Sequence, residues 1–245
     1  MSQEPRPVGK LGCLPGKVPV GLRDLTYYVA GDLLKAPPTV AVPTFPDWGM
    51  LGNDQYGDCG VAGLQHGFEA DATITKADES FPVTQQTIDY YLKYTNGQDA
   101  GVVLADFLDY VRRHRFYNHT ISAYAPVTVH DVPTLQAAVY LYGFVYAGIT
   151  VCSDMQTAFQ KHEPWTGAIC SGGIIGGHCV PIVGYDDQFI YVITWGGVQA
   201  ISYSAWHLIA TEAWAIISGE FEKAHGDGRG VSLTALKNDL DKLNN

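Results

Sequence analysis

Helical patterns occupy the first half of this chain, and strand patterns dominate the second half. Apolar residues recur at helical spacing over residues 58–73, 84–94 and 102–116. Patterns typical of strands follow at 121–129, 145–151, 179–185, 189–195 and 213–218, with further helices expected at 132–142 and 231–243. Helices and strands that are segregated in this way predict an α+β fold with a helical N-terminal half and an antiparallel C-terminal sheet.

Composition excludes several classes of protein. The chain has 245 residues, 47% of them hydrophobic, which is enough for a large core. Acids outnumber bases 25 to 15, whereas a nucleic-acid binder needs a basic surface. Neither a long apolar run nor an apolar signal region is present. We therefore expect no nucleic-acid or membrane partner, no signal peptide or transmembrane segment, and a cytoplasmic or virion-associated location.

The N-terminal segment differs from the rest of the chain. Residues 1–47 hold eight of the 13 prolines, and residues 1–35 carry five bases against three acids. This composition predicts an extended arm before the folded body, suited to wrapping the body or reaching a neighbouring subunit. The expected organisation is an arm over 1–47, a helical lobe over about 48–118, a β lobe over about 119–218, and a C-terminal helix over 219–245.

The cysteines number five and form no Cys-x-x-Cys pair. A disulfide scaffold is not expected at this length, and no spacing typical of zinc ligands occurs. Glycines at 172–177 lack the lysine of a phosphate-binding loop and the spacing of a dinucleotide site. The sequence therefore predicts reduced thiols, with no metal and no cofactor.

One cysteine stands where a nucleophile would be activated. A polar turn, Asn53 to Gly57, delivers Cys59 to the start of the helix predicted from Asp58. The positive end of a helix favours thiolate over thiol. Small residues in the first turn would let this helix pack close to a neighbour. A buried structural cysteine is the competing interpretation.

A thiolate needs a base, and His178 is the strongest candidate. It follows two glycines and opens a strand, so that its ring can face a cleft. His66 lies two turns beyond Cys59 on the same helix, too far along the axis to touch it. The remaining histidines are predicted at the surface, namely His114, His119, His130, His162, His207 and His225.

These two segments together resemble the papain-like cysteine peptidases. Asp47-Trp48 followed by Gly57-Asp58-Cys59-Gly60 is similar to the family's Asp-Trp and Gln-Gly-x-Cys-Gly-Ser-Cys-Trp-Ala runs. Gly177-His178-Cys179-Val180 and Val183-Gly184-Tyr185 are similar to its Gly-His-Ala-Val-x-x-Val-Gly-Tyr, and Thr194-Trp195-Gly196 to its Asn-Ser-Trp-Gly. The resemblance spans about residues 46–218 and implies the two-lobed papain-like fold.

The resemblance also implies roles for individual residues. Cys59 would be the nucleophile and His178 the base, with the Cys59 backbone N–H and Asn53 stabilising the oxyanion. Gln55 is the alternative oxyanion donor. Thr194 would accept a hydrogen bond from Nδ1–H of His178, and Trp195 would shield that contact from water.

Several positions depart from the family pattern. Tyr56 stands where the family has a disulfide cysteine, and Gly60 where it has tryptophan. Asn53 replaces a glutamine. The third residue of the triad, normally asparagine, falls at Ile193 when aligned on Trp195-Gly196, and at Thr194 when counted from His178.

Two classes of function follow. The first is a cysteine hydrolase that cleaves a peptide or amide bond in a peptide or protein substrate. Related thiol chemistry, such as acyl transfer or isopeptide cleavage, would use the same Cys59 and His178. The second is a pseudoenzyme: a degenerate papain-like structural or binding protein, for example a phage virion component, that associates with itself or a partner protein through the arm.

Overall fold

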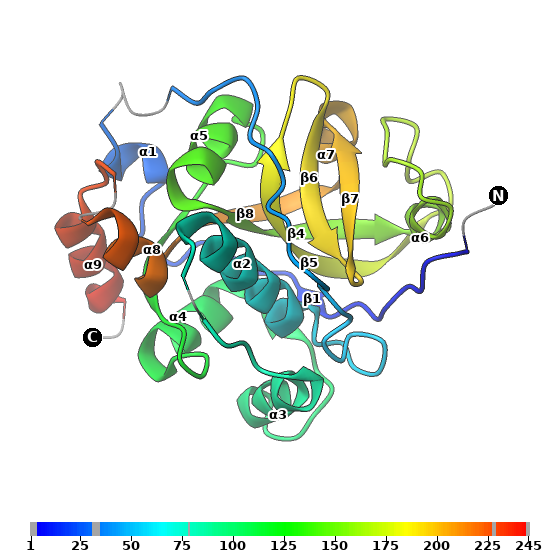
Figure 1. Ribbon diagram of the computed structural model, residues 1–245, viewed down its shortest axis with the longest axis horizontal. Helices are drawn as coiled ribbons and strands as arrows, with labels where there is room; N and C mark the ends of the chain where they lie inside the picture. Colours follow the sequence, from blue (N-terminus) through cyan, green and yellow to red (C-terminus); the bar gives the residue numbers. More distant parts are fainter. Residues whose placement is uncertain (1–3, 31–34, 78, 227–228, 244–245) are drawn as a thin grey trace.

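A six-stranded antiparallel sheet forms the centre of the molecule, as the computed structural model of residues 4–30, 35–77, 79–226 and 229–243 shows (Figure 1). Each pair of neighbouring strands in it is antiparallel. The strands, in spatial order, are β3 (Ile121–Pro126), β8 (Ala210–Ser218), β4 (Val145–Cys152), β5 (Ile174–Tyr185), β6 (Phe189–Thr194) and β7 (Gly197–Ser202).

Helices pack around this sheet; some precede its first strand, and others lie between or after its strands. They are α1 (Leu25–Tyr28), α2 (Cys59–Thr75), α3 (Thr84–Tyr94), α4 (Leu104–His114), α5 (Val132–Tyr142), α6 (Ser153–Gln160), α7 (Tyr203–Ile209), α8 (Gly219–His225) and α9 (Leu233–Lys242). The short strands β1 (Cys13–Leu14) and β2 (Val102–Val103) form a separate parallel pair. The predicted α+β class, with helices first and an antiparallel sheet after them, is confirmed.

Helix α2 is the element that positions the site, because it lies against β5 of the sheet (Figure 1). Its first turns carry glycine where the helix meets its neighbours. A Cβ at Gly60 would overlap Val102, and one at Gly63 would lie 3.1 Å from the Cys179 carbonyl oxygen. The expectation that small residues allow a close helix contact is confirmed.

Most element boundaries agree with the sequence expectations, and the differences have physical causes. The helix expected from 102 begins at Leu104, because Val102–Val103 pairs with the arm as β2. Strand β5 begins at Ile174, inside the segment 163–177 expected as a loop, because it pairs with β4 up to that residue. The short helices α6 and α8 carry too few turns to show a clear apolar period, and the sequence analysis missed both.

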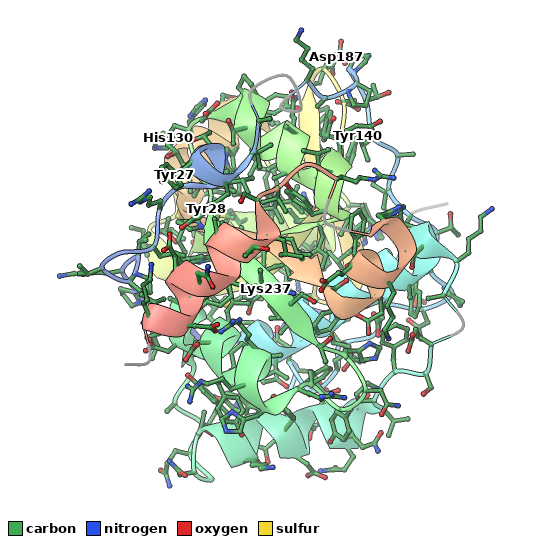
Figure 2. All side chains as sticks on the ribbon, turned by 90° about the vertical axis from the view of Figure 1, so that its left-hand side faces the viewer. Tyr27, Tyr28, His130, Tyr140, Asp187 and Lys237 are labelled. Atoms are coloured by element: carbon green, nitrogen blue, oxygen red, sulfur yellow. A yellow bond between two sulfur atoms is a disulfide. The ribbon has the colours of Figure 1, made fainter. Side chains whose placement is uncertain are left out.

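The N-terminal and C-terminal segments meet on one face of the molecule. Residues 4–30 and 35–47 contain only β1 and α1 as regular elements. The Tyr28 hydroxyl of α1 donates to Asp239 of α9 at 3.0 Å, and Figure 2 shows Tyr28 beside this helix. Lys237 of α9 pairs in turn with Glu222 of α8 at 3.1 Å. The segment after 218 thus holds two helices where one was expected.

The expectation that all cysteines are reduced is wrong. Cys152, the last residue of β4, forms a disulfide with Cys170 in the loop before β5. The two are 18 residues apart, and only the pairing of β4 with β5 brings their segments together, which spacing alone does not reveal. Among the described residues, no helix combines the length and apolar character needed to cross a bilayer.

Candidate active site

Cys59 is the first residue of α2 and is almost completely buried. Asp58 occupies the N-cap position, but its side chain makes no capping hydrogen bond. Burial, with a smaller contribution from the adjacent Cys59, raises the pKa of Asp58 to about 8. The helix terminus therefore presents its positive end to the thiol without a capping carboxylate between them.

His178 lies on β5 opposite Cys59, and Thr194 at the end of β6 holds its ring. The two side chains are joined by a hydrogen bond of 2.8 Å between Nε2 of His178 and Oγ1 of Thr194. The family resemblance implied Nδ1 in this contact. The ring is turned the other way, which leaves Nδ1 to interact with Cys59. Among the described residues, this Nδ1 has no partner at full hydrogen-bond geometry.

Trp195 covers the contact between His178 and Thr194. The ring centre of Trp195 lies 5.0 Å from that of the His178 imidazole. The ring centre of Phe159 lies 5.1 Å from that of Trp195. His178, Thr194 and Trp195 are each at most 4% exposed. Water is therefore kept from the hydrogen bond that orients the imidazole.

The surroundings of Cys59 favour the thiolate. Burial alone would raise the pKa of this thiol, but a hydrogen bond from Cys179 and the charge of His178 together hold that pKa well below its usual value. Cys179 itself is kept protonated, because burial and contacts with Cys13 and Cys59 raise the pKa of its thiol well above normal. An ionised sulfur next to an imidazole is a nucleophile with an acid beside it.

The two candidate oxyanion residues lie in different surroundings. Asn53 is buried and lines the same small cavity as Cys59 and His178. Its amide nitrogen donates to the carbonyls of Lys10 at 3.1 Å and Tyr56 at 3.2 Å, so both N–H groups are occupied. Gln55 is exposed and does not line the cavity.

The N-terminal arm is bonded to both segments that carry the candidate site. The cavity beside Cys59 measures only about 10 Å³, roughly the space of one water molecule. The Lys10 N–H donates to the Asn53 carbonyl at 2.6 Å, and the Gly12 N–H donates to the Gly177 carbonyl at 3.2 Å. Residues 9–12 thus run as an extended peptide between the segment of Cys59 and the strand of His178.

Two residues of this site, Cys179 and Cys13, were not identified from the sequence. Cys179, the residue after His178 on β5, is buried in the core, and its thiol contacts Cys59. Cys13 reaches the same sulfur cluster from the arm. The sequence signal for Cys179 was its position directly after His178. No feature of the local sequence indicates that Cys13 belongs to the site.

His66 lies beside the cavity and behaves as a core residue. Its Nε2 is 2.8 Å from the Trp48 carbonyl oxygen, and burial lowers its pKa to about 4. It is therefore neutral near pH 7 and serves to tie α2 to the segment before it.

Stability is expected to fall as pH rises, because buried carboxyl groups lie along α2. Burial raises the pKa of Asp58 and Glu69 to about 8 each, and that of Asp71 well above its usual value. The stability from a raised pKa is complete below the unfolded value near 4, and it is lost as pH rises through the folded value. His66, which is buried in its neutral form, lowers stability as pH falls below its unfolded pKa of about 6.5. This effect comes from one group, whereas three carboxyl groups act in the other direction.

We expect the melting temperature to fall by roughly 5–10 °C between about pH 5 and pH 9, equivalent to a few kcal/mol. The substitution Glu69→Gln keeps the hydrogen-bonding shape of the side chain and should flatten the profile. Calorimetry of both proteins across this range checks the prediction. A melting temperature that rises steadily with pH would contradict it.

Comparison with known structures identifies the fold. No protein-family model matches the sequence, and no curated protein sequence matches it. Among solved structures, the cysteine protease xylellain from Xylella fastidiosa aligns with a TM-score of 0.66 and 18% identity, over 87% of this chain and 97% of its own.

Two further structures are also similar. Procathepsin B S9 from Trypanosoma congolense has a TM-score of 0.59 and 13% identity, over 85% of this chain and 86% of its own. Procathepsin L 3 from Tenebrio molitor larval midgut has a TM-score of 0.56 and 17% identity, over 86% of this chain and 75% of its own. At such identities the likeness establishes the fold, and the chemistry must be argued from the site.

Proposed function

We propose that this chain, a divergent member of the papain-like superfamily by its fold, is a cysteine hydrolase that cleaves a peptide or amide bond. One observation carries the proposal. Cys59, at a helix start, lies against a His178 whose far nitrogen is fixed by Thr194 at 2.8 Å, and the pKa of the thiol is held well below normal. A structural cysteine needs neither an oriented imidazole nor a stabilised thiolate.

The geometry supports a two-step reaction. The Cys59 thiolate attacks the substrate carbonyl and forms a tetrahedral intermediate, whose oxyanion is stabilised by N–H groups at the start of α2. His178 donates its Nδ1 proton to the leaving amine, which departs as the acyl-enzyme forms. His178 then takes a proton from water, which attacks the thioester and releases Cys59.

The arm would have to leave the cleft before a substrate could enter. We propose that residues 9–12 act as a covering segment, because their backbone forms hydrogen bonds to both walls of the cleft. Their departure would also free the Asn53 amide, which now donates to the Lys10 carbonyl, so that it could face an oxyanion. The substrate class that fits this path is an extended peptide or an unfolded protein segment.

A second candidate function is a binding or structural protein on the same fold. The closed cavity of about 10 Å³ and the occupied amide of Asn53 favour it. In this alternative, the arm would serve assembly with another copy or a partner protein, and Cys59 would have no substrate.

The disulfide bears on where the protein works. Disulfides such as Cys152–Cys170 persist in oxidising surroundings and are rare in the cytosol of mesophiles. We therefore propose an oxidising compartment for this hydrolase in place of the cytoplasmic location expected from the sequence; a virion surface, the other expected location, is itself oxidising. Reductant in an assay should then be kept low enough to preserve this bond.

The proposal is tested by hydrolysis of an unfolded protein substrate and of a fluorogenic peptide-amide library. Cys59→Ala should lower the rate by about 1,000-fold or more, since the nucleophile itself is removed. Because the covering arm can hide activity, the same assays are run in a Gly12→Ala background, in which we expect the arm to leave the cleft more often. Hydrolysis that persists unchanged in Cys59→Ala, or that is undetectable in both backgrounds, would favour the binding protein.

A further inference from the structure

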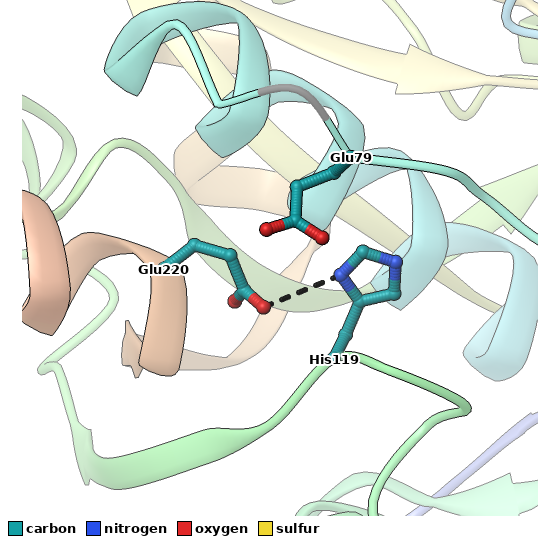
Figure 3. A group of neighbouring side chains, drawn as sticks. All are labelled: Glu79, His119 and Glu220. Atoms are coloured by element: carbon teal, nitrogen blue, oxygen red, sulfur yellow. Dashed lines mark ion pairs between the residues drawn. The ribbon is translucent and has the colours of Figure 1, made fainter.

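Three ionisable side chains converge well away from the cleft of Cys59 (Figure 3). Glu79 comes from the loop between α2 and α3, His119 precedes β3, and Glu220 stands at the start of α8. One ligand atom from each lies within 4.8 Å of the other two. Nδ1 of His119 is 3.5 Å from Oε1 of Glu220.

The imidazole of His119 is fixed in one orientation. Its Nε2 lies 3.3 Å from the Ser80 carbonyl oxygen, a group that can only accept a hydrogen bond. The ring is stacked on Phe81 at 4.6 Å and 3°, and on Phe68 at 5.3 Å and 18°. Nε2 therefore carries a proton, and Nδ1 is directed toward the carboxylates.

This arrangement brings a buried imidazole nitrogen and carboxylate oxygens together without enough hydrogen-bond partners. The side chains of His119 and Glu220 are 1% and 4% exposed. Nδ1 of His119 and Oε2 of Glu220 both lack a hydrogen-bond partner among the described residues. Glu79 adds a second carboxylate, and the buried Asp71 lies close enough to interact with Glu220. Buried carboxylates require a cation or a proton between them.

We propose that Glu79, His119 and Glu220 bind one divalent transition-metal ion, with Zn²⁺ as the best match. One imidazole nitrogen and two carboxylates form a donor set suited to zinc, whereas Mg²⁺ and Ca²⁺ prefer oxygen ligands alone. Tetrahedral zinc with bonds of about 2.0–2.2 Å places its ligand atoms about 3.4 Å apart. The separation of 3.5 Å between His119 and Glu220 fits this value.

The rest of the coordination follows from exposure and hydrogen bonding. Glu79 is only partly buried, so a change of rotamer can bring its oxygen closer to the other two ligands. A water molecule would complete the fourth position. The contact between His119 and the Ser80 carbonyl is the outer hydrogen bond that metal-bound histidines usually make.

Such an ion would join three segments that are distant in the sequence. The loop after α2, the start of β3 and the start of α8 would share one centre, which ties the helical half to the C-terminal helices (Figure 3). The site is therefore structural, independent of hydrolysis at Cys59. It also corrects the expectation that His119 lies at the surface, since this residue is 1% exposed.

The test uses the untagged full chain carrying Cys59→Ala, so that zinc does not bind the thiolate and imidazole of the cleft. After dialysis against a chelator, zinc is titrated by calorimetry. We expect one ion per chain and a melting temperature raised by about 5–10 °C when zinc is about 100 times its Kd. Cobalt in place of zinc should give visible absorption without the charge-transfer band of a sulfur ligand.

Variants in the same background locate the ion. Glu79→Gln and His119→Gln should weaken binding by more than the roughly 10–100-fold that loss of an outer hydrogen-bond partner costs. Glu79→Gln alters a partly exposed side chain, so it preserves a folded protein if His119→Gln does not. Glu69→Gln is the matched control, since it removes a buried carboxylate outside the cluster and should leave zinc affinity unchanged.

A second control addresses the exposed histidines. His130, labelled in Figure 2, and His207 have Nδ1 atoms 3.0 Å apart and could take up zinc weakly. His207→Gln should leave the measured affinity unchanged. The proposal is overturned if the parent chain binds no zinc, if zinc affinity survives Glu79→Gln, or if cobalt shows a sulfur charge-transfer band.

Discussion

Replacing His178 with alanine is expected to slow the alkylation of Cys59 by roughly 100-fold at about pH 6. An unperturbed thiol with a pKa near 8.5 is less than about 1% ionised at that pH. Hydrogen bonds from Cys179, together with the charge of the His178 imidazole and a hydrogen bond from it, lower the pKa of Cys59 against the effect of burial. Without that charge, most of the reactive thiolate is lost, which outweighs the higher intrinsic nucleophilicity of a less acidic thiol.

The measurement is labelling by a limiting amount of iodoacetamide, with each modified cysteine mapped by mass spectrometry. Cys179 is the internal control, because burial and its sulfur contacts raise the pKa of its thiol. It should label slowly in both proteins. The covering arm is present in both, so its effect cancels in the ratio of the Cys59 rates.

Thr194→Val separates orientation of the imidazole from its charge. The variant removes the 2.8 Å contact to Nε2 but leaves the ring in place, so labelling should slow by roughly 10-fold, less than in His178→Ala. Equal rates of Cys59 alkylation in the parent protein and in His178→Ala would show that no thiolate–imidazolium pair forms. The argument for catalysis would then fail.

The sequence was sufficient to predict the fold class and to single out Cys59 and His178. Both residues lie in contiguous motifs: a polar turn before a helix, and a glycine pair before a strand. Helical and strand periods along the chain are local signals, and they placed most elements within a few residues. The close packing of α2 then follows from Gly60, which lies against Val102 of β2, and Gly63, which lies against Cys179 of β5.

What the sequence could not predict depends on contacts between distant segments. His119 lies in a polar stretch, and only the stacking of Phe68 and Phe81 from the first half of the chain buries it. Cys152 and Cys170 are joined because a strand end and a loop meet in the folded sheet. The orientation of the His178 ring likewise depends on which strands lie on each side of it in the folded sheet.

The path of the N-terminal arm is the largest feature that the sequence could not predict. Gly12→Ala is expected to accelerate alkylation of Cys59 by a bulky reagent about 5- to 150-fold. A Cβ at Gly12 would overlap the backbone carbonyl of Gly57, which cannot move aside as a side chain can. Overpacking of this kind costs about 1–3 kcal/mol, and each 1.4 kcal/mol changes an opening equilibrium about tenfold.

Gly16→Ala is the matched control for this effect. It lies four residues along the same arm, and the nearest atom to its added Cβ would be a Val103 methyl group at 3.0 Å, which can shift. The control should label at the parent rate. In Gly12→Ala, Cys179 must stay slow to label, because rapid labelling there would indicate unfolding of the core. If Cys59 reacts equally fast in all three proteins, residues 9–12 do not limit access to the thiol, and the covering role of the arm is wrong.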